Sequence, residues 1–391
     1  MPIPKSKVLL SAAIALLAAA SLALPFAPLY DPWAWLVWGR EITNLDLDTA
    51  SGPSWKPLPV AFTTAVAPAG EAAPELWLAI ARAGWLASIA LAWTLASRLV
   101  VGGGIGVRLA GLLMPARIRR ARIAAGAVAA TGMVLLDDPF TSWPRQFAGG
   151  LAEPLLVALV LAAVERQLSG RAEQAFALAV AAALIRPEAW PFLIAYGCWL
   201  WLRSPELRRL LVFGGAVVVV LWFGLDLLGS GDPLTGAERA REGTGSPPGE
   251  ALEAIGRALN MVIAALWVAA AYTVWTAWRG GERAIVVLAA GALAWIAVVA
   301  ALAAAGYAGI PRFAAPAAAI HSPAITMFKA RPIASSASPG GEPVPSRARS
   351  APVSGSPEPS RSSPNHSSTT TAPPNTSRRR SSGERNHSQQ P

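Results

Sequence analysis

The stretch AIVVLAAGALAWIAVVAALAAA at residues 284–305 decides the fold class, because none of its side chains is charged. About 20 apolar residues in a helix are enough to cross the hydrocarbon core of a bilayer. The whole chain is 53% hydrophobic and only 14% charged, and its mean hydropathy is +0.42. Soluble globular domains carry about 25% charged residues. The sequence therefore predicts an all-α, polytopic transmembrane helical protein.

Similar apolar runs recur along the chain and predict about 9–10 spans. The predicted spans are 8–28, 76–97, 122–136, 151–165, 173–185, 189–202, 210–228, 259–278, 284–305 and, as the weakest, 313–328. The first run is also compatible with a cleaved signal peptide, although its apolar part is longer than the usual run of about 7–15 residues.

The composition changes after about residue 330, which divides the chain into two parts. Residues 1–330 form the predicted transmembrane domain. Residues 331–391 are rich in Ser, Pro and Arg and contain almost no large apolar side chains. Because such a segment cannot bury enough apolar surface to fold, we expect a disordered tail.

The net charge of +10 follows the loops between the predicted spans. Arg and Lys gather in alternate loops, at 98–122, 166–171, 203–209 and 279–283, whereas most acids lie in the other loops. This is the positive-inside pattern, which predicts a multi-pass plasma-membrane protein with a cytoplasmic N-terminus. It accounts for the basic charge without a nucleic-acid partner, so we expect none.

The sequence has few residues for metal or thiol chemistry. Its histidines are His321, His366 and His387, all at or beyond the end of the apolar region, and its one cysteine is Cys198, within an apolar run. These residues exclude an internal disulfide and do not make a zinc site. Proton transfer would therefore depend on carboxylates.

Polar residues of the predicted outer loops suit a substrate that carries a phosphate and a sugar. Arginine binds phosphate through bidentate, charge-assisted hydrogen bonds, tryptophan packs on sugar rings, and a carboxylate can accept a proton from a hydroxyl group. The candidates are Asp31, Asp46, Asp48 and Lys56 in the long first outer loop, 29–75, and Arg145, Arg186, Glu188 and Arg312 in later outer segments.

Asp31 also has a purely structural interpretation. An Asp-Pro pair is typical of a helix start, with Asp31 as the N-cap and Pro32 as the first helical residue. Trp33 and Trp35 likewise suit anchors at the membrane–water interface. The residues themselves leave capping and catalysis both open for Asp31.

Four segments resemble motifs of actinobacterial multi-spanning glycosyltransferase-like proteins of the GT-C class. They are DPWAW at 31–35, PSWKPLP at 53–59, LIRPEAWP at 184–191 and the stretch from Gly306 to Phe313. The resemblance implies a membrane-embedded enzyme that takes a sugar from a polyprenyl-phosphate donor at the outer face. It also implies an acidic catalytic residue in the first outer loop, where Asp31 is the best match.

The resemblance leads to a specific hypothesis. Asp31 would act as general base for an inverting transfer to a hydroxyl of an envelope glycan, lipid or protein, with Arg145, Arg186 and Arg312 on the phosphate. A divalent cation could bridge carboxylate and phosphate, but the spacing defines no metal site. The sequence departs from this family after Ala319, where the tail stands in place of the further apolar sequence that the resemblance implies.

Two other functions remain as alternatives. A transporter or flippase for a lipid-linked sugar would place ionisable residues near the middle of the membrane, whereas this sequence concentrates them at one rim. A non-catalytic membrane protein with a truncated C-terminus would tolerate the same residues without using them.

The charge pattern yields a topology prediction. In a chain carrying Cys198→Ala, the substitutions Ser51→Cys and Thr244→Cys should react with a membrane-impermeant thiol reagent on intact cells. Gly104→Cys should react only after the cells are opened, because its loop is predicted to face the cytoplasm. If only Gly104→Cys were labelled on intact cells, the predicted orientation would be wrong and the N-terminus would face outward.

Overall fold

The computed structural model describes residues 5–26, 28–102, 115–135, 147–242, 264–280 and 283–305. The chain divides into two units, Met1–Ala334 and Ser335–Pro391, and all described residues belong to the first. The predicted span 313–328 and the predicted tail 331–391 lie outside the described residues.

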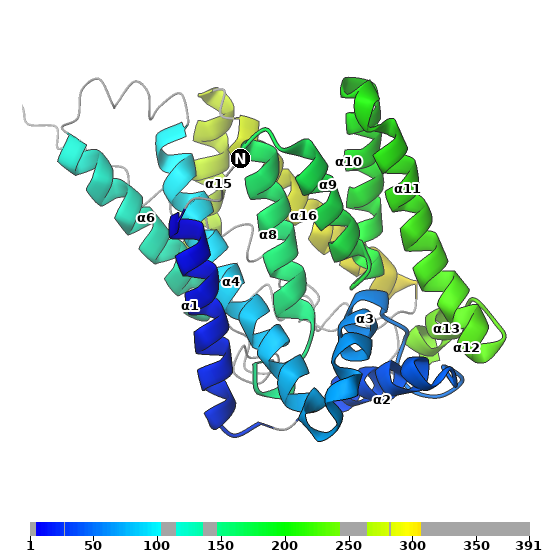
Figure 1. Cartoon of the computed structure of the whole chain (residues 1–391). Coiled ribbons are helices and arrows are strands. Elements are labelled where there is room, and N and C mark those ends of the chain that lie inside the picture. The colour runs from blue at the N-terminus through cyan, green and yellow to red at the C-terminus, as the bar shows by residue number, and fades with distance from the viewer. Residues whose placement is uncertain are drawn as a thin grey trace, which may run out of the picture. The chain divides into compact units, whose positions relative to one another are not determined.

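All regular structure in the described ranges is helical (Figure 1), which confirms the all-α prediction. The first half contains α1 (Lys5–Ala20), η1 (Ser21–Ala23), α2 (Tyr30–Asn44), α3 (Pro57–Val66), η2 (Ala67–Ala72), α4 (Ala73–Gly102), α6 (Pro115–Leu135) and α8 (Glu153–Leu168). The second half contains α9 (Ala172–Ala183), η3 (Pro187–Ala189), α10 (Trp190–Arg203), η4 (Pro205–Leu207), α11 (Arg208–Val219), the π-helical η5 (Val220–Gly224), α12 (Leu225–Ser230), α13 (Thr235–Glu242), α15 (Ala264–Arg279) and α16 (Arg283–Ala304).

Three of the described helical segments are long and apolar enough to cross a membrane. They are Pro57–Leu99, Pro205–Ser230 and Arg283–Ala304. Val8–Ala23 and Ala172–Ala183 are apolar but shorter. A helical membrane protein is thereby supported, while the span number, the plasma-membrane location and the orientation stay predictions.

The segment 29–75, predicted as an outer loop from its position between spans, is largely helical, and the candidate span Pro57–Leu99 begins within it rather than at residue 76. Helix α3 begins at Pro57, whose fixed φ suits the first turn of a helix. Helix α2 buries Trp35 and Trp38 while leaving Trp33 exposed. Helix α2 is too mixed in polarity to be recognised as a span, whereas α3 is apolar and forms the first part of the candidate span Pro57–Leu99.

Helix α2 packs against α3 at a small residue. A Cβ atom on Gly39 would lie 2.6 Å from the carbonyl carbon of Thr63, so only glycine allows this approach. The hydroxyl of Thr63 donates a 2.6 Å hydrogen bond to the carbonyl of Trp35. The α2–α3 pair is therefore held by close backbone packing as well as by aromatic burial.

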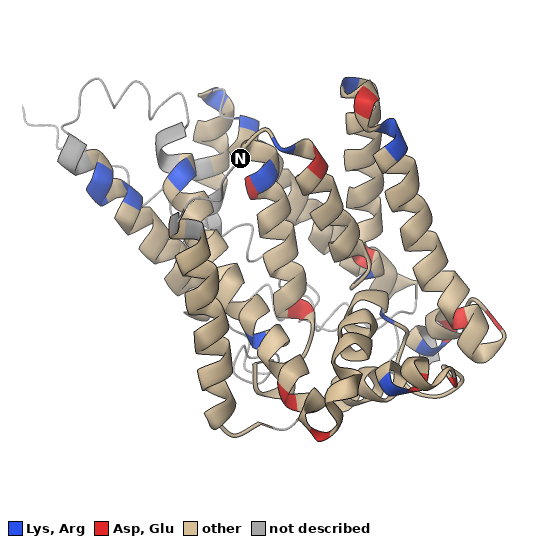
Figure 2. Cartoon of the chain, viewed as in Figure 1, with Lys and Arg blue, Asp and Glu red and all other residues tan. Residues whose placement is uncertain are grey.

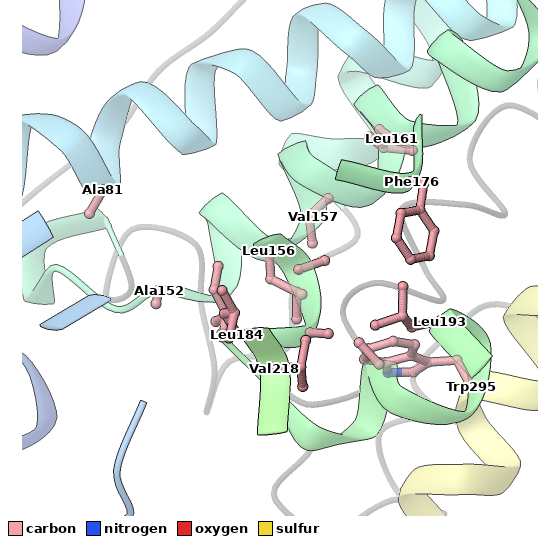
Figure 3. Close-up of a cluster of buried hydrophobic side chains, with 14 of the residues drawn as sticks. Ala81, Ala152, Leu156, Val157, Leu161, Phe176, Leu184, Leu193, Val218 and Trp295 are labelled. Carbon is pink, nitrogen blue, oxygen red and sulfur yellow. The ribbon is translucent and has the colours of Figure 1, made fainter. Parts of the chain in front are cut away.

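The apolar core is centred on α8, which packs against both α4 and α9. Leu156, Val157 and Leu161 of α8 are each at most 1% exposed. Figure 3 shows them in one cluster with Phe176 of α9 and with Trp295 of α16. The core thus joins helices from both halves of the described chain.

Helix α8 has charged residues at both ends, and its middle is apolar. Glu153 is its first residue, while Glu165 and Arg166 lie in its last turn. At 1.5 Å per residue, Glu153 and Arg166 are about 20 Å apart along the axis. Glu165 lies 3.8 Å from Arg98 of α4 and 3.2 Å from Arg166. Arginines gather at this end of α8 and at the neighbouring helix ends (Figure 2), which we call the Arg-rich end.

The packing of α2 on α3 can be tested with two glycines. Gly39→Val should destabilise the protein by about 1–3 kcal/mol, because the added atoms overlap the α3 backbone. Gly215→Ala in α11 is the control, since no atom lies within 4 Å of its Cβ position and helical Gly→Ala changes stabilise by about 0.5–1 kcal/mol. Thermal unfolding in detergent measures both, and equal effects would contradict the packing argument.

Candidate functional site

Asp31 lies in the first turn of α2 and its carboxylate binds a lysine. Leu29 is the N-cap of α2, and no side chain caps this helix, so the interpretation of Asp31 as N-cap is wrong. The helix begins earlier because the Leu29 amide donates to the carbonyl of Gly149, which fixes the entry of the chain. Asp31 Oδ2 instead accepts a 2.9 Å hydrogen bond from Lys56 Nζ.

Lys56 is a buried cation at the start of α3. Its side chain is 6% exposed, and its ammonium lies 4.9 Å from the ring centroid of Trp35. An ammonium removed from water needs an opposite charge and further favourable contacts. The carboxylate of Asp31 and the indole face of Trp35 provide them.

Arg186 is buried between two glutamates. It lies in the segment between α9 and η3, and its extended backbone agrees with the proline that follows it. Its guanidinium donates to the carboxylate of Glu153 and lies 3.7 Å from Glu188 Oε1. The three side chains are 8%, 3% and 7% exposed, in the order Arg186, Glu153, Glu188.

The two groups are neighbours in the fold. The amide of Leu58 donates a 3.0 Å hydrogen bond to the carbonyl of Leu184, which joins the start of α3 to the segment that carries Arg186. We call Asp31, Lys56, Glu153, Arg186 and Glu188 the charged cluster; it holds three carboxylates and two cations.

Electrostatics keep Arg186 charged in this setting. Burial alone would lower the pKa of Arg186, but the carboxylates of Glu153 and Glu188 outweigh it, and the pKa lies above its ordinary value. The negative charge of Asp31 also raises the pKa of Arg186, so the Asp31–Lys56 pair interacts electrostatically with Arg186 and its two glutamates. Arg186 is therefore a permanent positive charge behind Asp31.

Within the charged cluster, Asp31 is the residue most accessible from outside. Its side chain is 19% exposed, while the other members are at most 8% exposed. Asp31 can therefore meet a substrate directly. The predicted substrate contacts Lys56, Arg186 and Glu188 lie behind it, where they are better placed to hold its carboxylate than to bind phosphate.

The remaining predicted residues lie elsewhere. Asp46 and Asp48 are exposed, and Asp48 structures its own loop, since its Oδ1 accepts from the amide of Ala50 at 2.7 Å. Arg145 and Arg312 lie outside the described residues. In the described ranges, no three His, Cys, Asp or Glu side chains converge as metal ligands.

Asp226 of α12, which is not among the residues predicted from the sequence, is a carboxylate that is 3% exposed. It accepts hydrogen bonds from the hydroxyl of Thr49 at 2.9 Å and from the amide of Gly236 at 2.8 Å. Asp226 thereby ties the segment between α2 and α3 to α12 and α13. In the sequence, Asp226 is the only carboxylate inside the apolar run 210–228, which by itself predicts only a span.

A second missed residue is Arg82, which is 1% exposed in α4 and lies within a candidate span. Its guanidinium donates to the carbonyls of Ser21 and Phe147 and lies 4.5 Å from the ring centroid of Phe147. These contacts fasten α4 to the chain after α1 and to the chain before α8, so Arg82 has a structural role.

Comparisons with protein families, with curated proteins and with solved structures give no significant match.

The Arg186 group can be tested by its effect on stability. Arg186→Met should destabilise the protein by about 3–5 kcal/mol, because it leaves buried carboxylates without their counter-charge. Adding Glu153→Gln should recover part of this loss. Arg209→Met, at an exposed arginine, should change stability by at most about 0.5 kcal/mol. Thermal unfolding measures all three, and equal effects of Arg186→Met and Arg209→Met would refute the ion-pair assignment.

Proposed function

We propose that the protein is a membrane-embedded glycosyltransferase that moves a sugar from a polyprenyl-phosphate donor to a hydroxyl acceptor at the outer face of the membrane. The observation that carries this proposal is the charged cluster. In this strongly apolar helical protein, the cluster has one partly exposed carboxylate, that of Asp31. Its other four charged side chains are buried and paired behind Asp31.

Asp31 is suited to act as general base. A base must be held within hydrogen-bonding reach of the proton that it removes. Lys56 fixes the carboxylate through Oδ2, and the turn of α2 fixes the Asp31 backbone.

A resident divalent cation does not fit the described part of the cluster. The carboxylate of Asp31 binds Lys56, and those of Glu153 and Glu188 face Arg186. Hard cations need several converging oxygen ligands, which these ion pairs do not supply. The proposal therefore assigns the proton transfer to Asp31 alone, and leaves phosphate binding to Arg145 and Arg312 as a sequence-based expectation.

A transporter or flippase is the less favoured function. An ionisable residue inside a span is often part of a transport pathway. Arg82 and Asp226 lie within the candidate spans Pro57–Leu99 and Pro205–Ser230, so the ionisable residues are not all concentrated at one rim as the sequence predicted. However, Arg82 donates from Nε and Nη1 to backbone carbonyls and lies against the Phe147 ring, and only its Nη2 is buried without a hydrogen-bond partner among the described residues. Asp226 likewise accepts hydrogen bonds from Thr49 and Gly236. The accessible charge is at Asp31, which suits chemistry at the interface better than passage through the membrane.

The deciding experiment measures transfer by membranes that contain the protein, supplied with radiolabelled polyprenyl-phosphate sugars. Asp31→Asn should lower the rate by about 10²–10⁴-fold, because an amide cannot accept the proton. Asp46→Asn, at an exposed acid in the same region, should stay within a few-fold of the unsubstituted protein.

Stability controls separate lost chemistry from lost structure. Asp31→Asn removes the counter-charge of Lys56, so the double variant Asp31→Asn with Lys56→Met should be more stable and equally inactive. Activity of Asp31→Asn within a few-fold of the parent would exclude Asp31 as the base. Absence of transfer from every donor by the unsubstituted protein would reject the enzyme and favour the non-catalytic alternative.

A further inference from the structure

A groove of about 460 Å³ lies between α4 and α6, near the Arg-rich end. Its walls are formed by Trp93 and Ser97 of α4 and by Ile118, Arg119, Arg122 and Ile123 of α6. None of these residues belongs to the charged cluster, which includes the opposite end of α8. The groove is therefore separate from the proposed catalytic site.

Close packing fixes the two helices on one side of the groove. A Cβ atom on Gly126 would lie 2.6 Å from the ring of Trp93 and 2.7 Å from Ser97 Oγ, so these two α4 side chains pack closely against α6 at this glycine. The hydroxyl of Ser97 also donates a 3.0 Å hydrogen bond to the carbonyl of Arg122. These contacts set the position of the arginine-bearing turn of α6 relative to Trp93.

The charge of the groove is positive and uncompensated within the described part of the chain. Arg119 and Arg122 are three positions apart on α6, so they share one helix face. Both are exposed, and neither forms an ion pair with another described residue. By contrast, Arg98 and Arg166 at the same end share Glu165.

Apart from the two arginines and the hydroxyl of Ser97, the described lining is apolar or aromatic. Trp93, Ile118 and Ile123 offer surfaces for hydrocarbon rather than for a hydrated ion. Tryptophan and arginine are typical of the level of lipid headgroups. Another pair of this kind lies at the end of α15, where the Arg279 guanidinium is 4.3 Å from the ring centroid of Trp275.

We propose that this groove binds the phosphate headgroup of an anionic membrane lipid. Arg119 and Arg122 would hold the phosphate through charge-assisted hydrogen bonds, and the lipid chains would leave along Ile118, Ile123 and Trp93. A free phosphate ion would use the two arginines and gain nothing from the apolar walls, so the lining favours the lipid.

The test uses the purified full-length chain in detergent and a fluorescent phosphatidylglycerol, with binding followed by anisotropy. Arg119→Gln with Arg122→Gln should weaken binding about tenfold or more, since the charge-assisted hydrogen bonds of both guanidinium groups to the phosphate are lost. Arg120→Gln with Arg209→Gln is the matched control. It removes the same charge from exposed arginines outside the groove lining and should stay within about twofold if specific contacts dominate.

Two further arms identify the ligand. Unlabelled phosphatidylglycerol should compete, whereas phosphatidylcholine and inorganic phosphate should compete weakly. Arg119→Lys with Arg122→Lys keeps the charge and should give intermediate affinity, because lysine lacks the bidentate geometry. Its thermal unfolding and that of the Gln pair show that the fold is kept.

Three results would overturn the proposal. One is equal loss of binding in the Gln pair and its matched control, which would indicate a diffuse charge effect. Another is competition by inorganic phosphate as strong as that by phosphatidylglycerol, which would indicate a soluble-anion site. The third is unchanged binding in both the Gln and the Lys pairs.

Discussion

The buried guanidinium of Arg186 is the constraint on which the candidate site depends. It lies between Glu153, at the start of α8, and Glu188, in η3. An uncompensated charge at this depth would be strongly unfavourable, so the three side chains hold α8 and the end of α9 in one arrangement. The backbone hydrogen bond from Leu58 to Leu184 then extends this arrangement to α3.

The Asp31–Lys56 pair contains Asp31, the most exposed member of the charged cluster. Lys56 reaches Asp31 because α3 is anchored next to Arg186, and because α2 lies against α3 at Gly39. Aromatic packing supports this region, since Trp35 meets Trp77 of α4 edge-on with ring centroids 5.4 Å apart. The accessible carboxylate is thus positioned by charge pairing, by backbone contact and by aromatic burial together.

The sequence was sufficient to predict the helices of the apolar runs and several members of the charged cluster. Asp31, Lys56, Arg186 and Glu188 were recognisable because charged residues beside proline or tryptophan at the end of an apolar run are unusual. Their pairing was not predictable, since Glu153 and Arg186 are 33 positions apart and meet only through the packing of α8 on α9.

Other differences have local causes. Asp31 matched the pattern of a helix cap, but the backbone contact of Leu29 starts α2 earlier and frees the carboxylate for Lys56. The role of Asp226 could not be predicted because one acidic residue hardly changes the mean hydropathy of the apolar run 210–228. Its importance lies in its hydrogen bonds to Thr49 and Gly236, which belong to distant parts of the sequence.

The charged residues at the two ends of α8 set a condition on any membrane around this fold. With 16 residues, α8 is about 24 Å long, whereas the hydrocarbon core of a bilayer is about 30 Å thick. The sequence predicts a span at 151–165, which stays a prediction, and a span of this length would be shorter than the hydrocarbon core. Because Glu153 is buried and paired with Arg186, protein rather than a locally thinned bilayer would shield that end of α8 from lipid.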